Sequence, residues 1–141
     1  MADVIVDTSA LLAYFDASEP DHVAVTETIG ATTDLLVISP YAVAELDYLV
    51  ASRHGVDAEL AVLDELTAGA WELAGFGADE LKKAQSIITN YHDQQIGVAD
   101  ASNVVLAERY RTRTIVTLDR QHFDVLRSTG GDRFTVLPRP R

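Results

Sequence analysis

The chain has 141 residues and no cysteine, a length that suits one domain whose core needs no disulfide or zinc. Hydrophobic residues make up 48% of it, which excludes intrinsic disorder in spite of a formal net charge of −11. It contains no run of 18 apolar residues and no leader with a basic and an apolar part. We therefore expect a cytoplasmic protein with no contact to the membrane.

Charge is distributed unevenly along the chain. Residues 109–141 carry eight basic and three acidic side chains, whereas residues 1–108 carry three basic and nineteen acidic ones. Most of the molecule therefore repels a polyanion, which could dock only near the basic C-terminal segment. A solvated acidic surface that keeps the protein soluble is the simpler interpretation, and the charge alone favours it.

Short apolar, mostly β-branched runs alternate with segments of helical pattern and are separated by Gly, Pro and Asp. The expected elements, in chain order, are strand 3–6, helix 10–15, helix 22–29, strand 35–38, helix 41–52, helix 57–68, strand 71–76, helix 79–91, helix 100–110, strand 114–118, a turn or short helix to 126, and strand 134–137. Strands separated by helices predict an α/β fold with a mostly parallel sheet and helices on both faces. Ligands of such sheets bind beyond the carboxyl ends of the strands.

Two acidic residues directly follow apolar strands. Asp7 comes after Val-Ile-Val, and Asp119 comes after Ile-Val-Thr-Leu. If the two strands are parallel neighbours, their carboxylates emerge at the same edge of the sheet. Each residue could instead cap the next helix or form a turn, as Asp often does.

Two further acidic residues lie on predicted helices. Glu45 shares a helix face with Ala42, Leu46 and Leu49, where an ionised carboxylate is costly unless it is paired or binds a metal. Asp100 opens a helix and stabilises its first turn, with Asn103 one turn further on. Because most of that helix is apolar, the helix face alone does not decide the role of Glu45.

These four carboxylates have few basic neighbours in the sequence, so a cluster of them needs a cation. Oxygen ligands without cysteine favour Mg²⁺ or Mn²⁺ over zinc. The histidines share no metal-ligand spacing, and we expect surface or turn positions for all of them: His22, His54, His92 and His122. Crowding of the acids is expected to raise the pKa of at least one of them in the folded state.

Four motifs in the same order and spacing resemble the PIN domain, and more narrowly the VapC toxins of bacterial toxin–antitoxin pairs. The resemblance covers essentially the whole chain and implies a single PIN-like domain over residues 1–141. The motifs are Val-Ile-Val-Asp7-Thr8-Ser9, Ser39-Pro-Tyr-Ala-Val-Ala-Glu45, Gly97-Val-Ala-Asp100 and Thr117-Leu-Asp119-Arg-Gln-His-Phe.

The resemblance implies a three-layer α/β/α sandwich that binds Mg²⁺ or Mn²⁺ and cleaves RNA internally. Asp7, Glu45 and Asp100 would be the central carboxylates and metal ligands, and Asp119 would be the fourth. Supporting roles would fall to Thr8 and Ser9, which would steady the first carboxylate, and to Asn103. The family also implies a small VapB-type antitoxin that covers the active groove, and a homodimer.

Other classes of protein fit the residues less well. A phosphatase with Asp7 as nucleophile usually needs Asp-x-Asp, and position 9 is Ser. A phospho-acceptor receiver domain needs a lysine near the carboxyl edge of the sheet, whereas the two lysines here are adjacent on one helix. The main alternative is a catalytically silent protein-binding module that uses the apolar segments 10–15 and 42–50.

Overall fold

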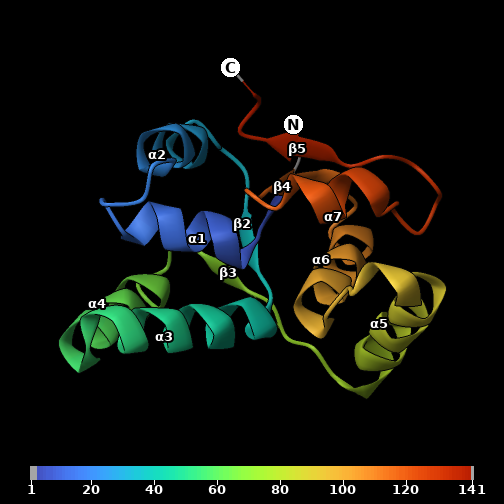
Figure 1. Ribbon diagram of the computed structural model, residues 1–141, viewed down its shortest axis with the longest axis horizontal. Helices are drawn as coiled ribbons and strands as arrows, with labels where there is room; N and C mark the ends of the chain where they lie inside the picture. The colour runs from blue at the N-terminus through green and yellow to red at the C-terminus, as the bar shows by residue number, and fades with distance from the viewer. Residues whose placement is uncertain (1–2, 141) are drawn as a thin grey trace.

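The computed structural model describes residues 3–140 and contains a five-stranded sheet with strand order β3-β2-β1-β4-β5 (Figure 1). Every neighbouring pair of strands is parallel. The strands are β1 (Val4–Val6), β2 (Leu36–Ile38), β3 (Glu72–Leu73), β4 (Thr114–Val116) and β5 (Thr135–Leu137). The earliest strand in the chain thus lies at the centre of the sheet.

Within residues 3–140, seven α-helices cover the two faces of this sheet and complete the predicted three-layer α/β/α sandwich. Helices α1–α4 pack on one face and α5–α7 on the other, as the two sides of Figure 1 show. The helices are α1 (Thr8–Phe15), α2 (His22–Gly30), α3 (Pro40–His54), α4 (Val56–Leu66), α5 (Ala78–Asn90), α6 (Val98–Arg109) and α7 (Arg120–Val125), and a 3₁₀ turn lies at His92–Gln94.

The side chains of β1 alternate between two apolar cores, as the period of two in a strand requires. Val4 and Val6 pack with α1–α4, whereas Ile5 packs with α5–α7. All three are buried, so β1 is covered on both faces, as expected for a central parallel strand. The two cores hold α1 and α6 firmly against the central strand.

Several boundaries and apolar positions differ from the sequence prediction. The strand expected at 71–76 is limited to Glu72–Leu73, and the helix expected from residue 100 already begins at Val98. Leu60 and Leu81 belong to the apolar patterns of the predicted helices 57–68 and 79–91, yet both side chains are exposed, because α4 and α5 each pack through a narrower face.

The helix expected over 57–68 already begins at Val56 and is preceded by Gly55. Its φ of 89° lies in the region that favours glycine, and this conformation lets α4 follow α3 with one intervening residue. Among residues 3–140, none of the helices has the length and apolar character needed to cross a bilayer.

The strand order reverses between β1 and β4, since β2 and β3 extend the sheet on one side of β1 and β5 extends it on the other. In open parallel sheets a crevice forms at such a reversal, beyond the carboxyl ends of the strands. Val6 pairs with Val116, and the Asp7 amide donates to the Val116 carbonyl at 2.9 Å. Asp7 therefore enters this crevice beside the residues that follow β4.

Candidate metal centre and active site

Asp7 is the most buried acidic residue of the site, with 4% of its surface exposed. It is the N-cap residue of α1 by position, but its side chain makes no capping hydrogen bond. The carboxylate instead turns to the sheet, where its Oδ1 accepts from Asn103 Nδ2 at 3.0 Å and its Oδ2 accepts from Thr117 Oγ1 at 2.8 Å. The structure therefore excludes a helix-capping explanation for Asp7.

Two hydroxyl groups link Asp7 to the segment after β4. Ser9 Oγ donates to Asp7 Oδ2 at 3.1 Å and accepts from the Leu118 amide at 2.9 Å. Thr117, which is fully buried, also accepts from the Asp119 amide at 3.0 Å through its Oγ1. The same hydroxyls thus fix the Asp7 carboxylate and the backbone that carries Asp119.

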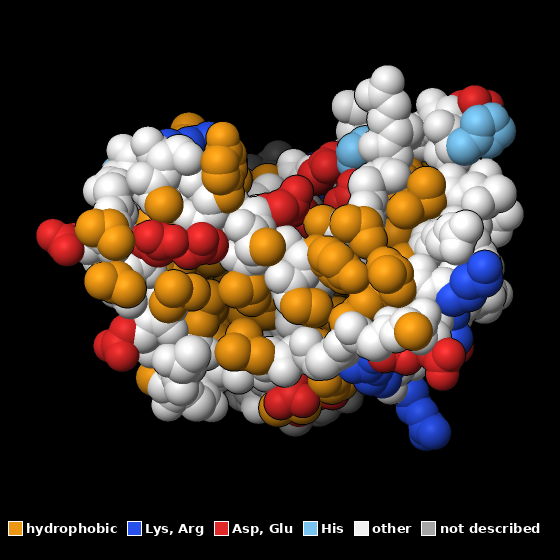
Figure 2. All heavy atoms as spheres, turned by 90° about the horizontal axis from the view of Figure 1, so that it is seen from below, with side chains coloured by type: hydrophobic (Ala, Val, Ile, Leu, Met, Phe, Trp, Pro, Cys, Tyr) orange, Lys and Arg blue, Asp and Glu red, His pale blue; other side chains and the backbone are white. Residues whose placement is uncertain are grey.

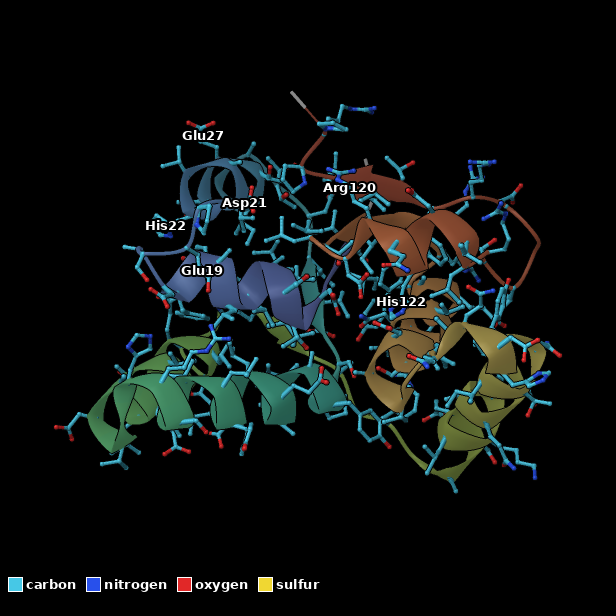
Figure 3. The ribbon with its side chains drawn as sticks, in the orientation of Figure 1. Glu19, Asp21, His22, Glu27, Arg120 and His122 are labelled. Atoms are coloured by element: carbon cyan, nitrogen blue, oxygen red, sulfur yellow. The ribbon has the colours of Figure 1, made fainter. Side chains whose placement is uncertain are left out.

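Asp100 and Asp119 meet at one imidazole. The His122 Nδ1 lies 2.8 Å from Asp100 Oδ2 and 2.9 Å from Asp119 Oδ2. One ligand atom from each of the three residues lies within 4.8 Å of the other two, so the group could hold a metal ion. Figure 3 shows His122 below α7 and beside α6, whereas the neighbouring Arg120 lies near β5.

Glu45 reaches the site from α3 but is exposed, so the expected burial of its carboxylate in an apolar stripe is wrong. The buried stripe of α3 consists of Ala42, Leu46 and Val50, and Glu45 lies at its margin. Thr8 Oγ1 donates to Glu45 Oε1 at 2.7 Å. The Thr8 hydroxyl therefore supports Glu45, whereas Asp7 receives a hydrogen bond from the Thr8 backbone.

The environment raises the pKa of two of these carboxyl groups. Burial is the largest cause for Asp7, whose pKa stays above its usual range although hydrogen bonds from Thr117 and Ser9 oppose the shift. For Asp100, burial and then the Asp7 charge raise the pKa to about 6, while His122 opposes the shift. The predicted rise is present, but desolvation contributes more to it than the predicted mutual repulsion.

All four predicted carboxylates line one cleft of about 630 Å³ between α1, α3, α6 and α7, together with Thr8, Ser9 and His122. Figure 2 shows acidic side chains gathered in a hollow at the upper middle of that face, with a histidine beside them. Asn103 lies behind the cleft wall, where it is fully buried against Asp7. The carboxylates of Asp7 and Glu45 lie in the cleft but outside the close group at His122.

This arrangement fits a divalent cation. Within residues 3–140, no lysine or arginine forms an ion pair with any of the four carboxylates. Asn103 Oδ1 is buried beside Asp7 without a hydrogen-bond partner. Buried anionic oxygens without a counter-charge are costly, and a bound cation would offset that cost. The donor set is mostly carboxylate, which suits Mg²⁺ or Mn²⁺.

The sequence reasoning missed two residues of this cleft. His122 was expected at a surface or turn position, yet it lies between Asp100 and Asp119. The Asp119-x-x-His122 spacing places both on one face of a helical turn, which is the signal that could have been used. The second residue is Thr117, whose place in a predicted strand gave no role to its hydroxyl. Thr117 directly follows β4 and donates to the carboxylate of Asp7, which directly follows the neighbouring strand β1.

The fold that carries this site is that of a known class of protein. The family model of the PIN domain matches residues 4–127, and the chain therefore belongs to the PIN-domain family. Within that family it is similar to VapC proteins. Ribonuclease VapC26 of Mycobacterium tuberculosis is 70% identical to it over 135 residues, which are 96% of this chain and all of that protein.

Solved VapC structures share the fold at much lower sequence identity. VapC20 of Mycobacterium tuberculosis, a toxin that cleaves the sarcin–ricin loop, superimposes with a TM-score of 0.77 at 16% identity and covers 83% of this chain and 90% of its own. A chain of the DNA-bound VapBC complex of Salmonella typhimurium gives a TM-score of 0.71 at 18% identity, with coverages of 96% and 98%. At these identities the comparisons establish the fold alone.

Proposed function

We propose that this protein is a metal-dependent endoribonuclease toxin that hydrolyses RNA phosphodiester bonds. The observation that carries the proposal is the convergence of Asp7, Glu45, Asp100 and Asp119 on one cleft at the reversal point of a PIN-domain sheet. The 70% identity to Ribonuclease VapC26 supports the same reaction. A catalytically silent binding module has no use for four carboxylates gathered in one cleft without an ion pair to lysine or arginine within residues 3–140.

The chain's own residues bind and orient. Asp7, Glu45 and Asp100 would hold the ion, with Asp119 as the fourth carboxylate of the same cleft. Thr117 and Ser9 prevent rotation of the Asp7 carboxylate, so its free lone pairs keep one direction. Carboxylates without basic partners repel a phosphodiester, so the metal-free cleft is expected to bind RNA poorly.

When bound, Mg²⁺ or Mn²⁺ would lower the pKa of a water molecule and neutralise charge on the phosphate. Arginines of residues 109–140 would hold the flanking RNA backbone, as the charge distribution suggests. Arg120 directly follows Asp119, and its guanidinium donates to the Pro138 carbonyl. That contact ties the C-terminal segment to α7.

RNA cleavage with and without a metal ion tests the proposal. Purified protein should cut total cellular RNA internally in millimolar Mg²⁺ or Mn²⁺, and an excess of EDTA should stop the reaction. Asp7→Asn, Glu45→Gln and Asp100→Asn should each lower the rate at least a hundredfold, whereas Asp119→Asn should lower it less if its carboxylate acts through water.

Asp64→Asn serves as the matched control, because Asp64 is an exposed acidic residue of α4 outside the cleft. Its rate should equal that of the unmodified protein. Unchanged cleavage by Asp7→Asn, or equal cleavage in EDTA, would contradict the assignment and favour the silent binding module.

We also propose that a VapB-type antitoxin inhibits the protein and that the chain forms a homodimer in the cytoplasm. The apolar segments first suggested for a partner, 10–15 and 42–50, mostly serve the core. The exposed apolar side chains here are Tyr48, within the second segment, and Val56 and Leu60 of α4. Such surfaces often mark interfaces. Light scattering of the purified chain tests the dimer, and loss of cleavage on adding the co-expressed antitoxin tests the inhibition.

A further inference from the structure

The His122 side chain lies in the cleft, beside two carboxylates, and not on the open surface. Its side chain is 27% exposed, and its Nδ1 lies within 3 Å of one oxygen each of Asp100 and Asp119. The Nδ1 atom of an imidazole carries at most one proton and can donate it fully to one of these oxygens at a time. A hydrogen bond from Nδ1 therefore accounts for one of the two short distances.

The first turn of α7 builds this position. Asp119 Oδ1 accepts from the His122 amide at 3.3 Å and caps the helix, which leaves Oδ2 directed toward the imidazole. Phe123, the next residue, is 1% exposed and packs edge-to-face against Phe134. The capped turn and the buried ring together fix the backbone from which both Asp119 and His122 extend.

The distances match those between neighbouring ligands of one ion. In an octahedral shell with bonds of about 2.1 Å, adjacent ligand atoms lie about 3.0 Å apart. The Nδ1–Oδ2 distances of 2.8 and 2.9 Å are close to this value. A small outward movement of the three side chains would therefore admit an ion between Asp100, Asp119 and His122.

We propose that His122 is a nitrogen ligand of the divalent ion and that it shifts the preference of the site from Mg²⁺ toward first-row transition ions such as Mn²⁺. The inference rests on the proposed metal dependence and adds a ligand that makes the site bind Mn²⁺ in preference to Mg²⁺. Mg²⁺ prefers oxygen ligands and retains its water molecules, whereas an imidazole ligand strengthens the binding of first-row transition ions.

Metal binding by the whole chain tests the inference without RNA. Calorimetric titrations with Mn²⁺ and with Mg²⁺ are compared for the unmodified protein, His122→Ala and His92→Ala. His92 is a matched control, because it is an exposed histidine whose ring lies beside Asp93. We expect His122→Ala to weaken Mn²⁺ binding at least tenfold and Mg²⁺ binding less than threefold, and His92→Ala to change neither.

Pulsed electron paramagnetic resonance of the Mn²⁺-loaded protein gives a second readout that does not depend on an affinity measurement. The unmodified protein should show the ¹⁴N coupling of a ligated imidazole, and His122→Asn should lose it. Absence of that coupling, or equal weakening of Mn²⁺ and Mg²⁺ binding in His122→Ala, overturns the inference. In those cases RNA cleavage that still needs a metal would leave the proposed function standing, whereas an unmodified protein that binds neither ion would overturn both.

Discussion

Replacing Asp100 by Asn is expected to stabilise the metal-free protein at neutral pH although it removes a group needed for cleavage. The folded state raises the pKa of Asp100 from 3.8 to about 6, mainly through burial and the Asp7 charge. Each pKa unit corresponds to about 1.4 kcal/mol, so ionised Asp100 destabilises the fold by at most about 3 kcal/mol. Because this side chain is partly exposed, solvent screening reduces the effect to about 1–2 kcal/mol.

The sign follows from proton binding. A raised pKa means that the folded state holds the proton more tightly than the unfolded state, so the destabilisation is full above pH 6 and fades as the pH falls through 6. In thermal melts with EDTA at pH 7.5, Asp100→Asn should melt about 3–8 °C above the unmodified protein. The difference should fall to about half at pH 5.

The control for this experiment is Asp64→Asn, which should leave the melting temperature unchanged at both pH values. If Asp100→Asn melts at or below the unmodified protein at pH 7.5, the carboxylate contributes favourable contacts that outweigh its desolvation. A difference of the same size at pH 5 and pH 7.5 would show that the titration of Asp100 is not its origin. Either result would refute the electrostatic account of the cleft.

Three further outcomes are expected. Thr117→Val removes the donor to Asp7 Oδ2 and should cost about 1–3 kcal/mol in urea unfolding and at least tenfold in cleavage rate; equal rates would refute the positioning of Asp7. Leu46→Ala empties a fully buried position of α3 and should lower the free energy of unfolding by about 2–5 kcal/mol, with a loss below 1 kcal/mol as the contrary result. Mg²⁺ at a hundred times its dissociation constant should stabilise the EDTA-treated protein by about 2.7 kcal/mol, which a calorimetric scan measures; no shift would contradict a folded-state metal site.

The positions of Asp7 and Asp119 are predictable because the geometry of a parallel sheet determines where the residues that follow its strands lie. Apolar runs separated by helices define parallel strands, and parallel strands end at one edge. A residue that directly follows such a run is therefore placed in space by the sequence pattern alone. The pairing of Val6 with Val116 brings the two strand ends together as that reasoning requires.

The orientation of Glu45 was not predictable in the same way. Most of α3 is apolar, so the sequence does not define a single buried face, and periodicity alone placed Glu45 with Leu46 and Leu49. In the structure the sheet and α1 bury Ala42, Leu46 and Val50, and Glu45 is left at the margin. Which stripe becomes buried depends on the helices packed against α3, and these are distant in sequence.

His122 illustrates a second limit. Ligand spacing in the sequence detects metal sites whose residues lie on one element, and the partner Asp100 is 22 residues away on α6. The contact exists because α6 and α7 pack on the same face of the sheet. Only the tertiary structure brings the two helices together. The local Asp119-x-x-His122 spacing can therefore reveal one partner of His122, but not Asp100.

Burial of Asp7 destabilises the fold when no metal is bound, and the same burial fixes the direction from which its carboxylate can bind an ion. Asp7 is almost fully enclosed between β1, Asn103 and Thr117, so its carboxylate has little freedom to follow an ion. An exposed carboxylate would avoid the desolvation that raises the pKa of Asp7, but it would bind an ion from many directions. Since an ion that binds only the folded state stabilises it by mass action, metal binding offsets this desolvation in the holo protein. We therefore expect the stability of the fold and the occupancy of the cleft to change together across metal concentrations.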